Sequence, residues 1–438
     1  SLNYLLNTAY NAGARIHTNS WGSAATSTQG QYTSEAEAVD DRSFNYDKVS
    51  NGQEGLTILF AAGNDGPGAG TVGSPSTAKN VVTVGNHQAR YSGAPDNLMS
   101  GSSRGPTDDG RIKPDIIAPG GYVRSCRAQE AQDIAGSSWQ STWYLEYTGT
   151  SMATPNAAGA ATLIREYLIE IAQRPSPQGA LVKALLVLGA TDINTRDIPN
   201  NNEGWGRVNL KETLAPSQGR GIWVDDRSVL TNSGASKSYV FNVTYANSQL
   251  KAVLAWSDYR GSRFASKALV NDLDLEVESP DGTVYLGNDF ANGRSTTTGT
   301  KDDINNLEVV LIDMAMKGIW TVRVKDAYHA GSGVQPFAIA VSGQGVNDLR
   351  PDPQVVANSM LLNVTIPQVG DQVRLTTQVF NGGNIKAESV DLAFMVDGTE
   401  LDRSTVDINP GASRQSTWYW TPQQSGPATL ELVIDPDD

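Results

Sequence analysis

Apolar and polar residues follow two different periods along this chain, and the change between them lies near residue 215. Before it, apolar runs of strand length, such as residues 56–62, alternate with segments in which apolar residues recur every three or four positions. Residues 180–190 form a longer apolar run that predicts a helix. Alternating strands and helices predict an α/β domain built on a largely parallel sheet.

The same pattern places further elements in this first part. Gly13 closes the first of them, because glycine suits the position after a helix C-terminus. The expected elements are a helix over residues 2–14, a short strand from residue 15, a surface helix over residues 36–49, and strands at residues 81–85 and within residues 113–120.

The rest of the chain reads as all-β. From residue 221 to about 343, short alternating runs are separated by turn residues, which predicts a jelly roll or β-sandwich. A third all-β unit begins near residue 348, with a turn at residues 381–384, and loosely resembles the CARDB-type immunoglobulin-like modules. The expected domains are residues 1–215, 216–345 and 346–438. The strands expected in the last two are residues 238–245, 251–256, 273–277, 308–312, 320–324, 337–341, 372–380 and 390–396.

Residues 148–155, Thr-Gly-Thr-Ser-Met-Ala-Thr-Pro, are the stretch around which the first domain is organised. The residues after it are amphipathic with a helical period, and Pro155 is tolerated in a first helical turn. Ser151 would then lie at a helix N-terminus, where free N–H groups stabilise a developing anion. A serine that merely caps the helix is the alternative, and this stretch alone leaves both open.

Asn64 is a second candidate for the same chemistry. Hydrolysis of a peptide needs a nucleophile, a base and hydrogen-bond donors for the oxyanion. Asn64 follows an apolar strand, and sites in α/β folds form at the carboxyl ends of parallel strands. Taken by itself, Asn64 is also a common turn residue at a strand exit.

Together these residues resemble the subtilisin-like (S8) serine proteases. The motifs that carry the resemblance lie within residues 1–214 and comprise residues 19–22, 61–64, 102–106, 113–120, 149–155 and 204–208. The resemblance implies that Ser151 is the nucleophile and Asn64 an oxyanion donor. It also implies that Ser20, Trp21 and Gly22 pair with substrate, that Ala61, Ala62 and Gly63 line the specificity pocket, and that Ser76 stands at its far wall, where the family often has glycine. With the β domain added, the layout resembles the KP-43-type alkaline proteases.

The catalytic base is the departure from this family. Its members present an aspartate, then a histidine in a His-Gly-Thr context, then the serine, whereas this chain has only His17, His87 and His329, none in that context. We therefore expect the aspartate and histidine upstream of Ser1. On this reading the protein is a serine endopeptidase that is secreted and monomeric and acts on proteins or peptides. The second hypothesis is a non-catalytic adhesion protein that uses a protease-like scaffold.

The charge and the composition of the chain exclude several classes of binding partner. A net charge of −14 argues against nucleic acid and anionic membranes, and no run of 18 or more apolar residues exists to cross a bilayer. The single cysteine, Cys126, excludes an intrachain disulfide and reads as a packing thiol.

An acidic row in the β domain suggests a metal. The period of a strand puts Asp272, Asp274 and Glu276 on one face. Such a row needs a cation or basic side chains to relieve its repulsion, and calcium prefers carboxylate oxygens. We expect structural calcium at Asp272 and Asp274, and a solvated strand face is an equal alternative.

Overall fold

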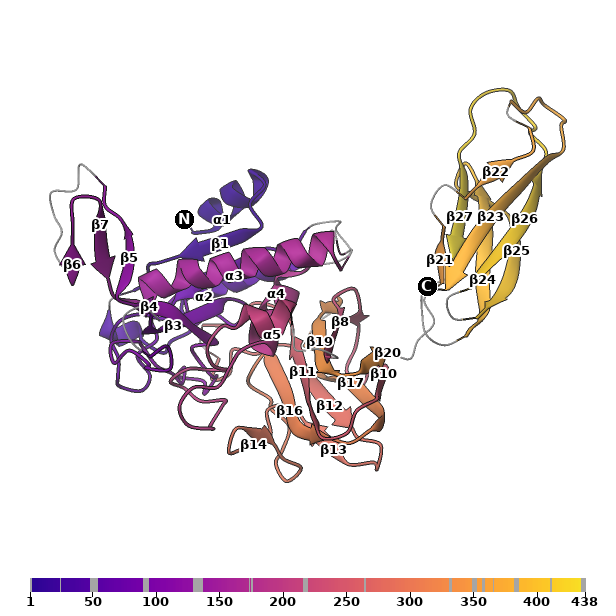
Figure 1. The fold of residues 1–438 in the computed structure, drawn as a ribbon. Helices are drawn as coiled ribbons and strands as arrows, with labels where there is room; N and C mark the ends of the chain where they lie inside the picture. The colour runs from indigo at the N-terminus through magenta and orange to yellow at the C-terminus, as the bar shows by residue number, and fades with distance from the viewer. Residues whose placement is uncertain are drawn as a thin grey trace. The chain divides into compact units, whose positions relative to one another are not determined.

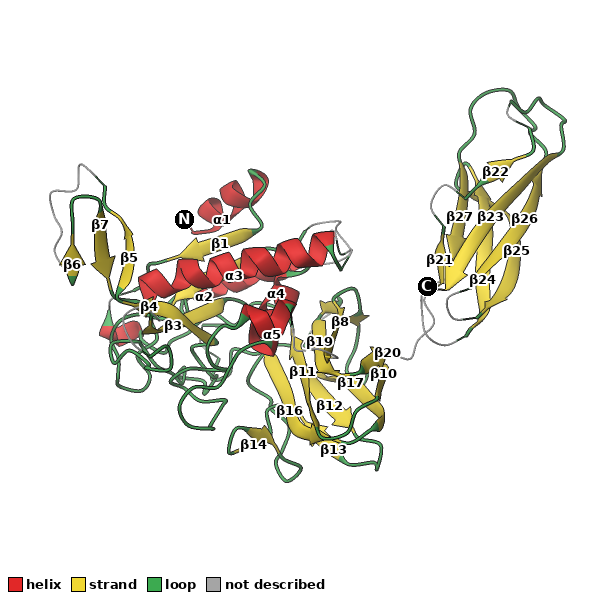
Figure 2. Ribbon diagram, viewed as in Figure 1, coloured by secondary structure: helices red, strands yellow, loops and turns green. Residues whose placement is uncertain are grey.

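The computed structural model describes most of the chain, and Figures 1 and 2 show its elements. The described residues are 2–23, 25–47, 54–89, 94–128, 137–172, 174, 176–215, 220–263, 265–330, 333–348, 353–356, 359–364, 366–381, 386–409 and 412–434. The chain divides into two compact units, Ser1–Ser238 with Val243–Val346, and Tyr239–Asn242 with Asn347–Asp438. All helices among the described residues lie before residue 216 (Figure 2).

A four-stranded parallel sheet forms the centre of the α/β part, as the sequence predicts. Its strands follow the order β1-β2-β3-β4, and each neighbouring pair is parallel. Their bounds are Ile16–Asn19 (β1), Thr57–Ala61 (β2), Val82–Gln88 (β3) and Ile116–Gly121 (β4). The helices around them are Leu2–Asn11 (α1), Ser34–Asp47 (α2), Thr150–Glu170 (α3), Gly179–Leu188 (α4), Leu210–Leu214 (α5) and the short 3₁₀ turn Thr26–Thr28 (η1).

Helix α3 packs across the parallel sheet and contacts all four strands (Figure 1). It can approach closely because its sheet-facing side is mostly alanine: Ala153, Ala157 and Ala161 are each at most 1% exposed. Helix α4, buried along its whole length, packs beside it. Burial of so much apolar surface is the main stabilising contribution to this part of the fold.

The prediction that the helix near residues 36–49 lies on the surface is wrong. Helix α2 forms where predicted, but half of its residues are buried, among them Val39, Phe44 and Asp47. The Asp47 carboxylate accepts hydrogen bonds from the first N–H groups of α4, Gly179 at 2.8 Å and Ala180 at 3.0 Å. An acidic group at a helix N-terminus is favourable, and this long-range cap draws α2 into the core.

A small antiparallel sheet, absent from the sequence predictions, precedes α3. It consists of Val123–Cys126 (β5), Trp139–Gln140 (β6) and Tyr144–Tyr147 (β7) in the order β5-β7-β6. Cys126 is exposed at the end of β5, so the expectation of a packing thiol is wrong.

The β part that follows along the chain has two larger sheets, of order β13-β12-β17-β10-β20 and β16-β11-β19-β8, and the second sheet is antiparallel throughout. One hydrophobic cluster includes residues of α3, of α4 and of the second sheet, so the two parts share a core. A jelly-roll topology stays a prediction. The strands are Arg220–Asp225 (β8), Val229–Leu230 (β9), Ser236–Val243 (β10), Ser248–Ala255 (β11), Asp272–Glu278 (β12), Val284–Leu286 (β13), Phe290–Ala291 (β14), Arg294–Ser295 (β15), Leu307–Ala315 (β16), Gly318–Tyr328 (β17), Gln335–Pro336 (β18), Ala338–Gln344 (β19) and Val346–Asp348 (β20).

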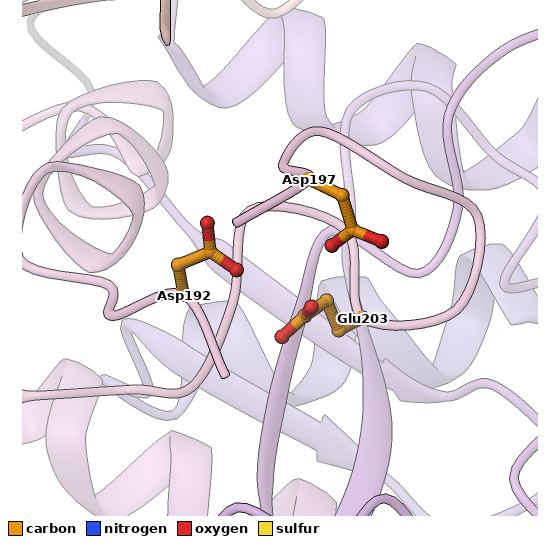
Figure 3. Close-up of side chains that lie close together, drawn as sticks. All are labelled: Asp192, Asp197 and Glu203. Atoms are coloured by element: carbon orange, nitrogen blue, oxygen red, sulfur yellow. The ribbon is translucent and has the colours of Figure 1, made fainter. Parts of the chain in front are cut away.

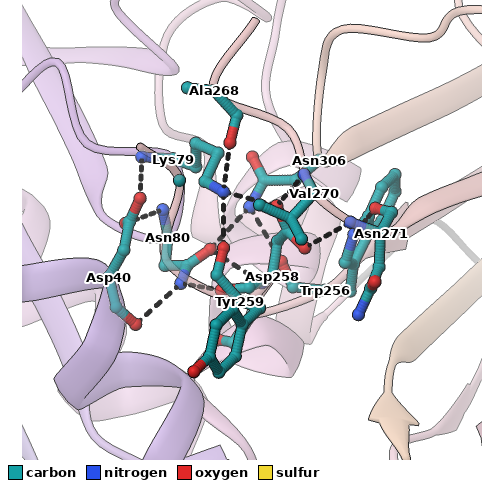
Figure 4. A network of polar contacts seen from close by, with 12 residues as sticks. Asp40, Lys79, Asn80, Trp256, Asp258, Tyr259, Ala268, Val270, Asn271 and Asn306 are labelled. Carbon is teal, nitrogen blue, oxygen red and sulfur yellow. Dashed lines mark hydrogen bonds and ion pairs between the residues drawn. The ribbon is translucent and has the colours of Figure 1, made fainter. Parts of the chain in front are cut away.

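A buried polar network joins the α/β part to the β part (Figure 4). Lys79 and Asp258 form an ion pair in which both side chains are fully buried. The Lys79 ammonium also donates to the carbonyl oxygens of Tyr259 and Ala268, each at 2.7 Å. Asn80 makes two further hydrogen bonds with the Asp258 backbone, at 2.8 and 2.9 Å. A buried charge pair needs such additional partners to offset its desolvation.

The second unit is an all-β module with its own core around Leu392, Phe394 and Trp418. Strand β23 pairs with β21, β22 and β26, and β24 pairs with β25 and β27. Of the turn expected at residues 381–384, residues 382–384 lie outside the described residues. The strands are Pro353–Val355 (β21), Leu361–Leu362 (β22), Val373–Asn381 (β23), Ala387–Val396 (β24), Thr399–Ile408 (β25), Ser413–Trp420 (β26) and Leu430–Ile434 (β27).

Two sequence predictions concern the division into domains and the absence of membrane-spanning segments. The division into three domains stays a prediction. The first compact unit contains most of the residues of both the first and the second expected domain. Among the described residues, none of the helices combines the length and the apolar character that crossing a membrane requires.

Candidate active site

Ser151 lies in the first turn of α3, with its backbone at the positive end of the helix dipole. The N-cap residue is Gly149, so the alternative in which Ser151 caps the helix is wrong. Among the described residues, the Ser151 hydroxyl makes one hydrogen bond, which is long at 3.5 Å, to the carbonyl oxygen of Ser20. Its oxygen is therefore weakly held and available for chemistry.

Pro155 lies one turn further into the helix than predicted. The helix begins at Thr150, so Pro155 is its sixth residue. In a regular helix the N–H of residue 155 would donate to the carbonyl of Ser151, and proline has no N–H. The Ser20 hydroxyl donates to that carbonyl instead, at 2.8 Å. The chain after β1 is thus bonded to the backbone of Ser151 itself.

Asn64 is oriented by Thr150, the residue before Ser151. The Asn64 side-chain oxygen accepts from the Thr150 backbone N–H at 2.9 Å and from the Thr150 hydroxyl at 3.1 Å. A backbone N–H only donates, so the atom that faces it is the amide oxygen. The amide nitrogen of Asn64 therefore points away from Thr150, and it donates no hydrogen bond to any residue in the described part of the chain. Sequence reasoning missed Thr150, although it stands inside the Gly-Thr-Ser motif.

Ser151, Asn64 and Thr150 line a cavity of about 290 Å³. Gly63, on its wall, has φ of +110°, and a side chain there would meet the Ser103 hydroxyl at 2.7 Å, so the wall requires glycine. Both predicted catalytic residues and six of the seven predicted substrate-binding residues line this cavity. The predicted residues among its lining are Ser20, Trp21, Gly22, Ala61, Ala62, Gly63, Asn64 and Ser151, and the others are Ser23, Asp65, Gly73 and Thr150.

Ser76 is the exception, and its expected place in the pocket wall is wrong. It is 2% exposed and does not line the cavity. Its hydroxyl donates to the Gly73 carbonyl at 2.5 Å, and its own carbonyl accepts from Thr83 at 2.6 Å. Gly73 stands at the cavity instead, because the turn carries Ser76 inward toward β3.

No histidine is among the described residues that line the cavity. The His17 ring on β1 bonds to Asn19 at 2.9 Å, and burial lowers the His17 pKa. His87 is 2% exposed on β3, and burial lowers its pKa to about 4. His329 pairs with Asp326 at 2.7 Å in the β part. Each histidine thus has a structural setting away from Ser151, as the sequence predicts.

Comparison with known proteins agrees with this geometry. Residues 3–206 match the model of the subtilase family, and residues 350–438 match that of CARDB. The chain contains a subtilase domain. Serine protease AprX of Bacillus subtilis (strain 168) is 39% identical over 164 residues, which are 36% of this chain and 35% of AprX. The Dictyostelium discoideum serine protease/ABC transporter B family protein tagD is 26% identical over 435 residues.

Coverage of these relatives is partial. The tagD match covers 69% of this chain and 23% of tagD. Among solved structures, sphericase matches with a TM-score of 0.34 and 26% identity, over 48% of this chain and 61% of sphericase. The chain therefore spans about a quarter of tagD and about a third of AprX. Beside the subtilase domain, the CARDB match coincides with the second compact unit.

The acidic row that follows the subtilase domain is held mainly by basic side chains. Asp272, Asp274 and Glu276 on β12 are 8%, 2% and 6% exposed, so the alternative of a solvated face is wrong. Lys301 lies 2.5 Å from Asp274 and 3.3 Å from Glu276, and Lys325 lies 2.7 Å from Glu276. Asp272 differs: one of its oxygens is buried and has no hydrogen-bond partner among the described residues. Burial, and next the charge of Asp274, raise the pKa of Asp272 to about 7.

A second acidic group lies in the loops before α5 and was not predicted. Oxygens of Asp192, Asp197 and Glu203 all lie within 4.8 Å of one another (Figure 3). Burial raises the pKa of Glu203 to about 7, and Asn200 donates to Asp197 at 2.9 Å and to Glu203 at 3.2 Å. These residues are five and six positions apart on irregular backbone, so no helical or strand period could have signalled the group. Carboxylates that cluster do not by themselves identify a ligand.

Proposed function

We propose that the protein is a serine endopeptidase that hydrolyses peptide bonds through an acyl-enzyme formed on Ser151. The subtilase domain supports a peptidase role. The observation that supports the proposal is the orientation of Asn64: its oxygen bonds to Thr150, and Asn64 and Ser151 line the same cavity, where the Asn64 N–H₂ group would donate to the oxyanion. Preorganised donors of this kind stabilise the charge that develops during acyl transfer.

The chemistry follows from these positions. The Ser151 oxygen attacks the carbonyl carbon of the scissile peptide bond, and its proton passes to a base. The oxyanion accepts hydrogen bonds from the Asn64 amide and from the Ser151 backbone N–H at the helix start. Collapse of this intermediate expels the amine, which takes up the proton, and leaves an ester on Ser151. Water then hydrolyses the ester and restores the hydroxyl.

Substrate would lie along the chain segment after β1. Residues 20–22 and 61–63 form two sides of the cavity, and Trp21 is 46% exposed beside it. Backbone groups of Ser20 and Gly22 would pair with an extended peptide, as a strand pairs with a sheet edge. The substrate class is therefore an unfolded or extended polypeptide segment.

The proposed mechanism also needs a base that takes the proton of the Ser151 hydroxyl. A serine hydroxyl is a weak nucleophile unless a base is adjacent, and the described cavity contains no histidine. We place the histidine and its aspartate in residues that precede Ser1, and we place the protein outside the cell. Calcium at Asp272 and Asp274 is also proposed, supported by the unpartnered buried oxygen of Asp272.

The test compares the protein carrying its upstream residues with the chain that begins at Ser1. The longer protein should cleave a quenched fluorescent peptide, and Ser151→Ala should abolish cleavage without loss of folded structure. A non-catalytic scaffold is indicated if the longer, folded protein binds peptides but leaves them intact. Cleavage that survives Ser151→Ala would contradict the assignment of the nucleophile.

A further inference from the structure

Four lysine side chains are buried among the described residues, each at most 3% exposed. A buried ammonium is costly unless an opposite charge lies beside it. Three of the four satisfy this rule through carboxylates at ion-pair distance: Lys79 with Asp258, and Lys113 and Lys183 with Asp115. Lys251 is the fourth, and no described carboxylate lies within 4.0 Å of its ammonium.

Lys251 stands on β11, opposite the end of α4. Its ammonium donates to the Val187 carbonyl at 2.7 Å, which explains one of its three hydrogens. The negative end of the α4 dipole favours a cation at this place. The other two hydrogens have no acceptor among the described residues. The lysine is thus held in position with unused donors.

Those donors face a cavity of about 660 Å³ between the end of α4 and the β part of the same compact unit. Three arginines line the cavity together with Lys251: Arg196, Arg220 and Arg294. After burial, the charges of Arg220 and Arg294 lower the pKa of Lys251 further, to about 7, so the cations lie close enough to repel one another. An anion in the cavity would relieve this repulsion.

Two carboxylates near the cavity form ion pairs with its arginines. Glu212 lies 3.1 Å from Arg220. Asp313 lies 2.8 Å from Arg196 and 2.5 Å from Arg294. Asp192 also lines the cavity, with its carboxylate toward Asp197 and Glu203, as Figure 3 shows. Its negative charge raises the pKa of Lys251 and so opposes the effect of burial and of the arginines, but no ion pair joins the two side chains. The described residues therefore place no counter-charge within 4.0 Å of the Lys251 ammonium.

We propose that this cavity binds a small oxyanion of the size and charge of phosphate or sulfate, with Lys251 as its central ligand and Arg220 and Arg294 beside it. The oxyanion offers acceptors to the two hydrogens of the Lys251 ammonium that have none among the described residues, and arginine side chains recognise tetrahedral oxyanions well. Since the cavity borders both the end of α4 and the β sheet, a bound anion would stabilise their contact. The proposal does not depend on peptidase activity.

The experiment titrates inorganic phosphate, and separately sodium sulfate, into the whole chain by calorimetry, with sodium chloride at matched ionic strength as reference. We expect saturable binding of at least one oxyanion and a rise in Tm of about 2–5 °C near saturation. Lys251→Met should abolish both responses, and Lys237→Met, which removes an exposed lysine, should leave them unchanged.

Lys251→Met is expected to fold, because replacing an uncompensated buried charge with an apolar side chain is often stabilising. Should it fail to fold, Arg294→Gln provides a second variant, with at least tenfold weaker binding expected. Heats and Tm values that match chloride would overturn the proposal, since Lys251 would then be a neutral amine that only caps α4. Saturable binding that persists in Lys251→Met would also overturn it.

Discussion

The side-chain oxygen of Asn64 lies 2.9 Å from the backbone nitrogen of Thr150. This hydrogen bond ties the end of β2 to the start of α3. Because Thr150 directly precedes Ser151, the same contact fixes the position of the proposed oxyanion donor relative to the proposed nucleophile. Their relative position is thus set by a hydrogen bond between the bend that follows β2 and the first residue of α3.

The role of Asn64 as a donor is tested by two substitutions in the protein that carries its catalytic base. Asn64→Ala should lower kcat by about 10²–10³ with little change in KM, the loss known from removing the corresponding donor of subtilisin. Asn64→Asp keeps an oxygen toward Thr150 but has no N–H, so steady-state kinetics should show a similar loss. A change confined to KM in both variants would show that Asn64 only shapes the pocket.

The hydrogen bond from Ser20 to the Ser151 carbonyl should be coupled to Pro155. Ser20→Ala leaves that carbonyl without its donor, and Pro155→Ala supplies a helical N–H for it. In urea denaturation, Pro155→Ala should therefore stabilise the Ser20→Ala protein more than it stabilises the wild type. The expected coupling is about 0.5–1 kcal/mol. Additive effects of the two substitutions would mean that Ser20 does not replace the missing N–H.

His87 should make the fold sensitive to acid. Its Nδ1 lies 2.9 Å from the Gln88 carbonyl, which only accepts, so Nδ1 carries the proton, and Nε2 is buried without a partner. Burial lowers the folded pKa from 6.5 to about 4, so the unfolded state binds more protons between these values. The free energy of unfolding should fall by up to about 3 kcal/mol as pH drops through this window.

His87→Asn provides the control for this effect, because asparagine can donate to the same carbonyl but does not titrate. The difference in unfolding free energy between wild type and variant should change between pH 6.5 and pH 4. A difference that stays constant across this range would show that His87 is not the group responsible.

Calcium is tested on the whole chain by its melting temperature. If Asp272 and Asp274 bind the ion, millimolar Ca²⁺ should raise Tm above its value in chelator, because a ligand that binds only the folded state stabilises it. Asp272→Asn combined with Asp274→Asn should remove most of that rise. An equal rise with monovalent salt at matched ionic strength would show screening only, and would leave Lys301 as the counter-charge of the row.

Local patterns in the sequence predicted the sheet strands, α3 and the motifs that meet in the active site. They did so because β2 and α3 have clear periods and the motifs sit at their ends. Local patterns could not predict contacts between segments that are far apart in the sequence. The partner of Asp274 is Lys301, 27 positions away, and the burial of α2 depends on Asp47 capping α4, more than 130 positions away.

The placement of Ser76 shows the same limit at short range. Its neighbours in sequence suggested a pocket wall, but the direction of each side chain there depends on how the turn packs on β3. Gly73 and Ser76 are three residues apart, and one faces the cavity while the other is buried. Residue identity alone does not encode that choice.

The central claim is that Ser151 becomes a nucleophile when its base is present. The most direct measurement is mass-spectrometric mapping of the adduct left by a fluorophosphonate on the protein that includes the residues upstream of Ser1. We expect one adduct, on Ser151, which is lost in Ser151→Ala and forms far more slowly on the chain beginning at Ser1. An adduct on another residue, or none on the folded longer protein, would contradict it.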